Sequence, residues 1–175
     1  EVDFVTIGAG TSGLAAAVSA LDHGASVIML EANYDIGGHG LVSGGNVHLG
    51  GGNSRQRKFG IEDSADKVYE DWVRHDHRDS RYSDRDLVRA FADENADAFE
   101  FLVENGVQFQ DQATGPQAAS TVRRQGRTVQ WPIASERVTH HVTRVGSGLV
   151  RALEKSARAK GAEVLLEHRM TRIIR

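Results

Sequence analysis

Residues 1–33 read EVDFVTIGAGTSGLAAAVSALDHGASVIMLEAN, and this stretch decides the fold. The apolar run from Phe4 to Ile7 is short and ends at a glycine, which is typical of a buried parallel strand. Residues 14–21 have helical composition with an apolar face, and Gly24 predicts the end of that helix. Residues 25–30 form a second predicted buried strand. The order of these elements predicts a β-α-β unit of about thirty residues.

Three glycines lie between the first predicted strand and the helix, with the spacing G-x-G-x-x-G. In this context Gly8 permits a tight turn, Gly10 lets a pyrophosphate approach the backbone, and Gly13 lets the helix pack on the strand. The free N–H groups at the helix start suit an anion. Glu31 follows the second strand, eighteen residues after Gly13, where its carboxylate can accept from both hydroxyls of an adenosine ribose and disfavours a 2′-phosphate. The residues predict a dinucleotide site unsuited to NADP, and a plain strand-turn-helix corner is the alternative.

The composition bounds the class of protein. The chain has 175 residues, of which 39% are hydrophobic, and this is enough to bury a core. A net charge of -3 gives no indication of nucleic acid or an anionic membrane, and the lack of cysteine excludes disulfides and thiolate metal sites. No apolar run approaches the roughly 20 residues that span a bilayer, and no signal-like start is present, which favours a cytoplasmic location. The start at Glu1 and the apolar end MTRIIR predict a fragment, incomplete at the C-terminus.

Further elements are predicted along the rest of the chain. Twelve of the 19 glycines lie between Gly8 and Gly52, which indicates backbone close to a large partner, and residues 33–60 are predicted as a functional glycine-rich connection. A helix over 64–75 is followed by one that begins near Ser83, where Ser83 and Asp86 resemble a capping box, and ends at Asn105-Gly106. A helix over 148–160, closed by Gly161, precedes strand-like segments at 163–166 and 171–174, whereas 110–137 give no clear prediction. The elements predict an α/β fold with a doubly wound core, in which these side chains are expected to be buried: Trp72, Phe91, Phe99 and Leu102.

The sequence after Glu31 separates FAD from NAD. An NAD domain usually continues promptly into another β-α unit, but residues 31–56 run on as EANYDIGGHGLVSGGNVHLGGGNSRQ. An acid followed by Gly37-Gly38 and then Ser43-Gly44-Gly45 resembles the flavoproteins of the fumarate reductase and succinate dehydrogenase family, which includes urocanate reductases and 3-ketosteroid dehydrogenases. The end of the chain, GSGLVRALEKSARAKGAEVLLEHRMTRIIR, resembles the helix and strand that return to the FAD domain in that family.

The resemblance implies a Rossmann-like FAD-binding domain of the glutathione-reductase/fumarate-reductase type, with FAD as cofactor. It implies an FAD-binding region over 1–110, an irregular connection over 111–145, and a return helix and strand over 146–175, without the capping domain. In the family the Gly-Gly segment passes the pyrophosphate and ribityl chain, the second glycine cluster lies along the isoalloxazine ring, and a backbone group lies beside the adenine. The cofactor contacts predicted from spacing and resemblance together are Gly8, Ala9, Gly10, Thr11, Ser12, Gly13, Glu31, Ala32, Gly37, Gly38, His39, Gly40, Ser43, Gly44, Gly45 and Met170.

The resemblance also bears on the chemistry. His39 occupies the position where membrane-bound succinate dehydrogenases bond a histidine covalently to the flavin, and a histidine that only contacts the flavin or the loop is the alternative. The implied reaction is hydride transfer between flavin N5 and a C–C bond beside a carbonyl or carboxylate of a dicarboxylate, urocanate-like or steroid enone substrate. Catalytic residues are expected beyond Arg175, so we expect no turnover from this stretch alone. An NAD-binding dehydrogenase domain and a non-catalytic FAD-binding module are the alternatives.

Three polar clusters favour other interpretations. His75 and His77 lack a third metal ligand at a recognisable spacing, which favours a solvated turn over a metal site. The basic run within 123–127 is too short for a nucleic-acid interface and lacks interleaved aromatic residues, so exposed surface is predicted. Adjacent histidines usually point in different directions, so at most one of His140 and His141 is expected near the flavin or substrate.

Overall fold

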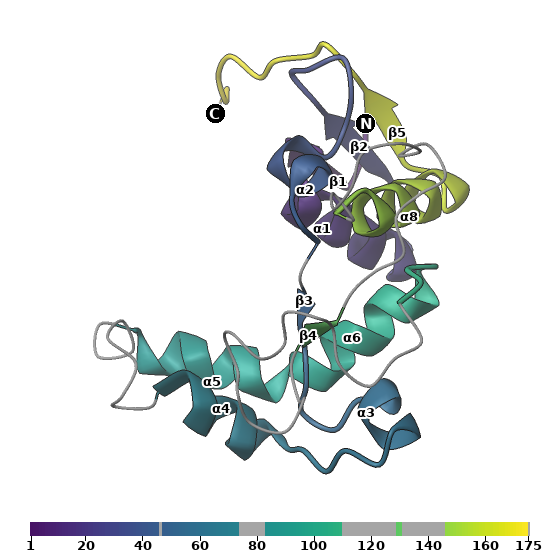
Figure 1. Ribbon diagram of the computed structural model, residues 1–175. Helices are drawn as coiled ribbons and strands as arrows, with labels where there is room; N and C mark the ends of the chain where they lie inside the picture. Colours follow the sequence, from purple (N-terminus) through teal and green to yellow (C-terminus); the bar gives the residue numbers. More distant parts are fainter. Residues whose placement is uncertain (46, 74–82, 110–128, 131–145, 175) are drawn as a thin grey trace. The chain divides into compact units, whose positions relative to one another are not determined.

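The computed structural model describes residues 1–45, 47–73, 83–109, 129–130 and 146–174 (Figure 1). The chain forms two compact units, each with its own packing. The first unit comprises Glu1–Gly45, Asn105–Gln108 and Pro132–Arg175, and the second comprises Asn46–Glu104 and Phe109–Trp131. The predictions made for His75, His77, the 123–127 run, His140 and His141 lie outside the described residues.

A three-stranded parallel sheet in the order β1-β2-β5 lies at the centre of the first unit. Its strands are β1 (Phe4–Ile7), β2 (Val27–Leu30) and β5 (Glu163–Leu165). Helix α1 (Thr11–Asp22) connects β1 to β2, and Gly24 follows its end with a φ of +81°, as the sequence predicts. Because Leu30 on β2 pairs with Leu165 on β5, the end of the chain extends the N-terminal β-α-β unit.

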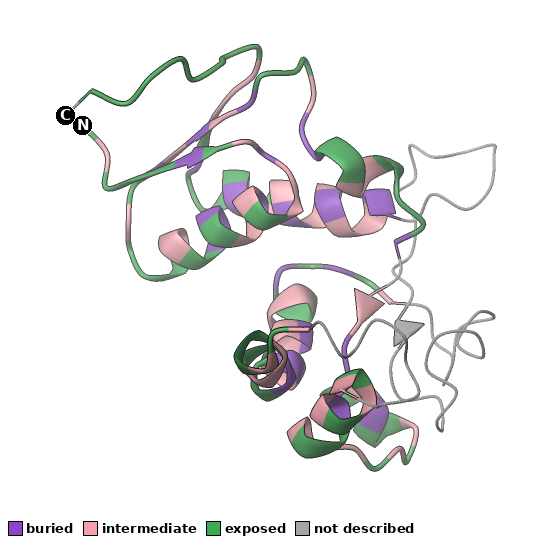
Figure 2. Ribbon diagram, turned by 90° about the vertical axis from the view of Figure 1, so that its left-hand side faces the viewer, coloured by how far each residue is buried: buried purple, intermediate pink, exposed green. Residues whose placement is uncertain are grey.

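One layer of helices covers one face of this sheet. Helix α1 packs against β1, β2 and α8 (Gly146–Ala159), and Figure 2 shows buried as well as exposed residues along both helices. The buried side chains recur at helical spacing, with Leu14 and Val18 in α1 and Val150, Leu153 and Ala157 in α8. The steps from β1 to β2 and from β2 to β5 go in the same direction, and right-handed crossovers then place both helices on one face. The prediction of a doubly wound core is therefore wrong for the described residues.

The described residues leave the opposite face of the sheet uncovered. Val5 and Ile7 are 47% and 57% exposed, and their partners on β2, Ile28 and Leu30, are half-buried. On the covered face Met29 is fully buried. The expectation that β1 is a buried strand is wrong for the described part of the chain, which places a helical layer against only one of its two faces.

The glycine-rich connection contains short elements that the sequence analysis missed. They are α2 (Gly38–Val42) in the first unit and β3 (Val47–His48) and α3 (Ser54–Lys58) in the second. Each is too short to show a periodic apolar pattern, which explains why sequence periodicity did not reveal them. Strand β3 pairs antiparallel with β4 (Val129–Gln130).

The remaining helices of the second unit are α4 (Ala65–Val73), α5 (Arg85–Asp93) and α6 (Asn95–Glu104). The continuous helix predicted from Ser83 is thus two helices that break at Glu94. Its predicted cap is also wrong, because the Asp84 carboxylate, and not Ser83, accepts the N–H groups of Asp86 and Leu87 at 3.0 and 3.1 Å. A carboxylate one residue nearer to the first helical turn takes the N-cap position.

The C-terminal segment does not form the second predicted strand. Residues 171–174 have no strand assignment, and Ile173 and Ile174 are 74% and 81% exposed. Their β-branched composition is strand-like, but no described strand lies beside them to accept a ladder of hydrogen bonds. None of the described helices combines the length and hydropathy needed to cross a membrane.

Candidate functional site

The N-terminus of α1 has the properties of an anion site. Gly10 is its N-cap, no side chain caps it among the described residues, and the first turn contains no acidic residue. The first intrahelical bond runs from the Leu14 N–H to the Gly10 carbonyl at 2.9 Å, so the N–H groups of residues 11–13 precede the helical ladder. These N–H groups and the positive end of the helix dipole favour a phosphate at this position.

The three glycines of GAGTSG differ in what surrounds them. Gly8 has a φ of +98°, and a Cβ on Gly13 would lie 2.0 Å from the Gly8 carbonyl oxygen, in agreement with the turn and packing roles predicted for them. A Cβ on Gly10 would meet no atom within 4 Å, and its φ of −76° suits any residue. Neither packing nor backbone geometry within the protein requires glycine at position 10. The open position is compatible with the close approach of a ligand that the motif predicts for Gly10.

Ala9 connects three of the predicted site segments through its backbone. Its N–H donates to Oε2 of Glu31 at 2.9 Å, and its carbonyl accepts from the Gly37 N–H at 2.8 Å. Oε1 of Glu31 accepts from the Asn33 N–H at 2.9 Å, and Glu31 is only 7% exposed. A carboxylate accepts about four hydrogen bonds, so each oxygen of Glu31 keeps capacity for a ligand hydroxyl. The GAGTSG loop, the acidic residue Glu31 and the Gly37-Gly38 turn therefore lie together.

The glycines around α2 also fall into two groups. A Cβ on Gly40 would lie 2.4 Å from Oγ1 of Thr11, and one on Gly146 would lie 2.1 Å from the Gly40 carbonyl oxygen, so close contact between helices explains both. A Cβ on Gly44 would meet nothing within 4 Å, as at Gly10. The Ser43 hydroxyl donates to the Gly40 carbonyl at 2.9 Å and accepts from the Gly45 N–H at 3.2 Å. Gly44 thus shares with Gly10 the open surroundings that suit a ligand.

The other predicted contacts are more exposed. Ser12, Ala32, Gly38 and His39 are exposed, and Met170 is 39% exposed in the irregular segment after β5. That segment runs beside the site, because the His168 N–H donates to the Glu31 carbonyl at 2.8 Å. No group of three potential metal ligands occurs in the part of the chain that the structure describes.

The glycine run at residues 50–52 is held by a polar network in the second unit. Its three N–H groups donate in turn to Oδ1 of Asn95, to Oδ2 of Asp63 at 3.0 Å, and to Oε1 of Gln56 at 2.8 Å. Gln56 and Asn95 are each 1% exposed. This run therefore binds the protein's own side chains, which differs from the expectation that the whole glycine cluster approaches a large partner. The network was missed because its amide and carboxylate side chains lie far apart between Gln56 and Asn95 and show no local pattern.

An aromatic cluster of the second unit corrects the expected core. Trp72 and Phe91 are 42% and 38% exposed and meet edge-on with ring centroids 5.3 Å apart, whereas Phe99 is buried as expected. The ring of His48 meets Trp72 at 6.4 Å, and burial lowers the pKa of His48. The aromatic pair lies at the edge of the packed helices because α4 and α5 bury only part of their apolar faces.

The chain matches a family model described as an FAD binding domain over residues 3–175. The chain belongs to this FAD-binding family. The predicted Rossmann-like FAD-binding fold class and the choice of FAD over NAD are thereby confirmed.

Two relatives and one solved structure illustrate the relationship of this FAD-binding domain. Urocanate reductase of Eggerthella lenta is 39% identical over 107 residues, which are 61% of this chain and 17% of that protein. NADH:fumarate oxidoreductase of Klebsiella pneumoniae is 28% identical over 174 residues, 98% of this chain and 17% of that protein. The structure of 3-ketosteroid-delta4-(5alpha)-dehydrogenase from Rhodococcus jostii RHA1 with 4-androstene-3,17-dione has a TM-score of 0.77 at 22% identity, over 95% of this chain and 38% of that one. The chain thus spans less than half the length of each of these proteins.

The residues of the FAD-binding domain fit a dinucleotide. The open space at Gly10, the N–H groups at the start of α1 that precede its helical ladder, and the buried carboxylate of Glu31 lie close together. They offer donors for phosphate and acceptors for ribose hydroxyls, which are the two polar parts of the adenosine diphosphate half of FAD.

Replacing Glu31 with Gln is expected to weaken FAD binding about 10- to 100-fold. A glutamine has one acceptor oxygen, so its NH₂ group faces one of the two N–H donors that Glu31 now satisfies, and a ribose hydroxyl loses a charged acceptor. FAD titration followed by flavin fluorescence measures the change. Glu163→Gln, an exposed residue on β5, is the matched control and is expected to bind as the unsubstituted protein does. Equal affinities for both variants would remove Glu31 from the site.

Proposed function

We propose that the protein is an FAD-dependent oxidoreductase that transfers hydride between flavin N5 and a C–C bond beside a carbonyl or carboxylate. The observation that carries the proposal is Gly10, whose missing side chain leaves space for a ligand at an uncapped helix start. The named substrates of the relatives support the reaction class, because urocanate and fumarate each carry a C=C bond conjugated to a carboxylate. The steroid dione bound in the structural neighbour carries an enone.

In this proposal the chain's own residues bind and orient the cofactor. The N–H groups of residues 11–13 bind the pyrophosphate, and Glu31 accepts from the adenosine ribose. The turn at Gly37-Gly38 follows the pyrophosphate towards the ribityl chain, residues 43–45 lie along the flavin, and the backbone of Met170 lies beside the adenine. His39 contacts the flavin without a covalent bond. FAD, when bound, supplies the two-electron chemistry, and regions 1–110 and 146–175 hold it.

The visible spectrum of the purified full-length protein tests the cofactor. We expect a flavin band that acid precipitation releases into the supernatant, and we expect His39→Ala to behave in the same way. A band that stays in the pellet, and moves to the supernatant in His39→Ala, would contradict the noncovalent assignment. A protein that stays colourless after incubation with FAD would contradict FAD binding and favour the NAD alternative.

Reoxidation of the reduced protein tests the reaction. After anaerobic reduction with dithionite, we expect one of fumarate, urocanate and a steroid enone to restore the flavin band within seconds to minutes. The hydride acceptor must be conjugated to a carboxylate or carbonyl, so the saturated analogue succinate serves as the control for fumarate. Failure of all three acceptors in a protein that holds FAD would favour the non-catalytic FAD-binding module.

A further inference from the structure

Helix α8 contacts the Gly37-Gly38 turn directly. A Cβ on Gly37 would lie 2.6 Å from Cγ1 of Val150, and Gly37 itself is buried with a φ of +101°. The preceding residue, Ile36, is 1% exposed. Val150, which lies more than a hundred positions later in the chain, therefore packs directly against the turn.

The next residue on α8 adds an ion pair to this contact. Nη1 of Arg151 donates to Oδ1 of Asp35 at 2.8 Å, and Nη2 donates to Oδ2, so the pair is bidentate. Nη1 also donates to Oε2 of Glu154 at 2.9 Å. The side chains of Arg151 and Asp35 are 25% and 37% exposed. A planar guanidinium that meets a carboxylate with two parallel bonds fixes the orientation as well as the distance of its partner.

Asp35 connects Arg151 to the backbone of the turn. Its Oδ1 also accepts the N–H of Ile36 at 2.8 Å, one residue before Gly37. Hydrogen bonding to Asp35 is the largest cause that raises the pKa of Arg151, while desolvation opposes it, so the guanidinium stays charged at neutral pH. Asp35 thus joins a charged group on α8 to the backbone just before the turn.

We propose that Arg151 is a positioning residue for FAD, which acts through Asp35 to hold the Gly37-Gly38 turn in its binding conformation. The inference rests on the proposed cofactor site. Two consecutive glycines can adopt many backbone conformations, so a free turn would lose that freedom when the cofactor binds. The Arg151–Asp35 ion pair and the contact with Val150 hold the turn in one conformation before FAD binds. Preorganisation of this kind raises affinity by lowering the entropic cost of binding.

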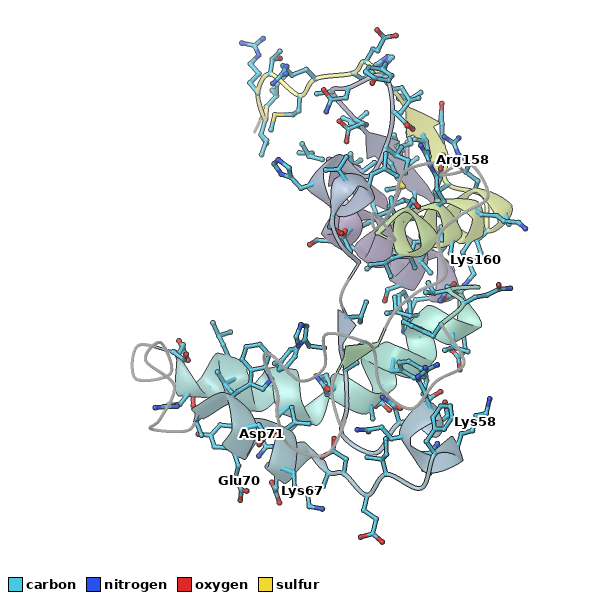
Figure 3. The ribbon with its side chains drawn as sticks, viewed as in Figure 1. Lys58, Lys67, Glu70, Asp71, Arg158 and Lys160 are labelled. Carbon is cyan, nitrogen blue, oxygen red and sulfur yellow. The ribbon has the colours of Figure 1, made fainter. Side chains whose placement is uncertain are left out.

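FAD titration of four test variants and one control variant in the full-length apo protein tests the inference. We expect Arg151→Gln and Asp35→Asn each to weaken binding about 10-fold, and the double variant Asp35→Asn/Arg151→Gln to be no weaker than either single one, because both remove the same pair. Arg151→Lys keeps the charge without the bidentate geometry and is expected to restore part of the loss. Arg158→Gln is the matched control, since Arg158, labelled in Figure 3, lies on the same helix and pairs with Glu154 at 3.0 Å without contacting Asp35.

The outcomes separate this inference from a purely structural role and from the proposed function. Urea unfolding of the apo forms of Arg151→Gln and Arg158→Gln is expected to give similar midpoints, because partly exposed ion pairs contribute little to global stability. If Arg151→Gln binds FAD as tightly as Arg158→Gln, or if the two single effects add in the double variant, the positioning role is overturned. If the unsubstituted protein binds no FAD, the proposed function itself has failed.

Discussion

Gly13→Ala is expected to destabilise the apo protein by about 3 kcal/mol, at the upper end of the cost of overpacking a well-packed contact. The added Cβ would lie 2.0 Å from the carbonyl oxygen and 3.1 Å from the carbonyl carbon of Gly8. Non-bonded heavy atoms prefer about 3.5–4.0 Å, and both opposing atoms are backbone atoms of the strand-to-helix turn, which no side-chain rotation can move away. Helix α1 would have to separate from β1, and the buried contacts of Leu14 and Val18 would weaken with it.

Urea unfolding followed by far-UV circular dichroism measures this effect in the apo protein. Gly24→Ala is a useful comparison, because a Cβ there would meet nothing within 4 Å. The cost of that substitution comes only from the φ of +81°, which is unfavourable for alanine. We expect a loss of about 1 kcal/mol in that variant, from the left-handed backbone alone. Equal unfolding midpoints for Gly13→Ala and the unsubstituted protein would show that α1 does not pack on the turn as described.

Gly10→Ala is expected to weaken FAD binding about 100-fold or more while it changes the stability of the apo protein by less than about 1 kcal/mol. The methyl group would occupy space that no protein atom fills, so the folded apo chain tolerates it. The loss of a good N-cap residue and the reduced entropy of the unfolded chain have opposite signs and similar sizes. The same methyl group would keep a pyrophosphate from the N–H groups of α1, and two lost charge-assisted hydrogen bonds account for the expected factor.

FAD titration and urea unfolding are each applied to Gly10→Ala and to Gly13→Ala, so that cofactor affinity and stability are compared at the two positions. Gly10→Ala should lose the cofactor and keep its urea midpoint, whereas Gly13→Ala should lose stability whether or not FAD is added. A Gly10→Ala protein that binds FAD with unchanged affinity would place the pyrophosphate elsewhere, and the proposed site would have to be abandoned.

The sequence predicted those parts of the fold whose information is local. The strand, turn, helix and second strand up to Glu31 each carry their own periodicity or glycine signal, and the positions of β1, α1 and β2 follow from them within a few residues. Helix α8 and Gly161 were found for the same reason. The break at Glu94 was not found, because the apolar spacing continues through it from α5 into α6 and only the turn itself interrupts the helix.

The parts that were missed depend on residues far apart in the chain. Nothing near Asp35 indicates that Arg151 pairs with it, since a single charge in a loop has many possible partners and the pair is separated by 116 positions. The uncovered face of the sheet was also missed, because Val5 and Ile7 have the same apolar character whether or not a second layer lies against them. Of the candidate site, the glycine motif and Glu31 could be predicted from the sequence. The backbone hydrogen bonds of Ala9 to Glu31 and Gly37 could be found only in the structure.

The pairing of Leu30 with Leu165 also has a consequence for the order in which the protein is made. Ribosomes add about 5 to 20 residues per second, so β5 emerges roughly 7 to 27 seconds after β2. During that interval the N-terminal β-α-β unit exists without α8 and β5, and its apolar helix face and strand edge are open to chaperones or to other nascent chains. Residues 146–174 contain α8 and β5, so the proposed cofactor site stays incomplete until they have left the ribosome.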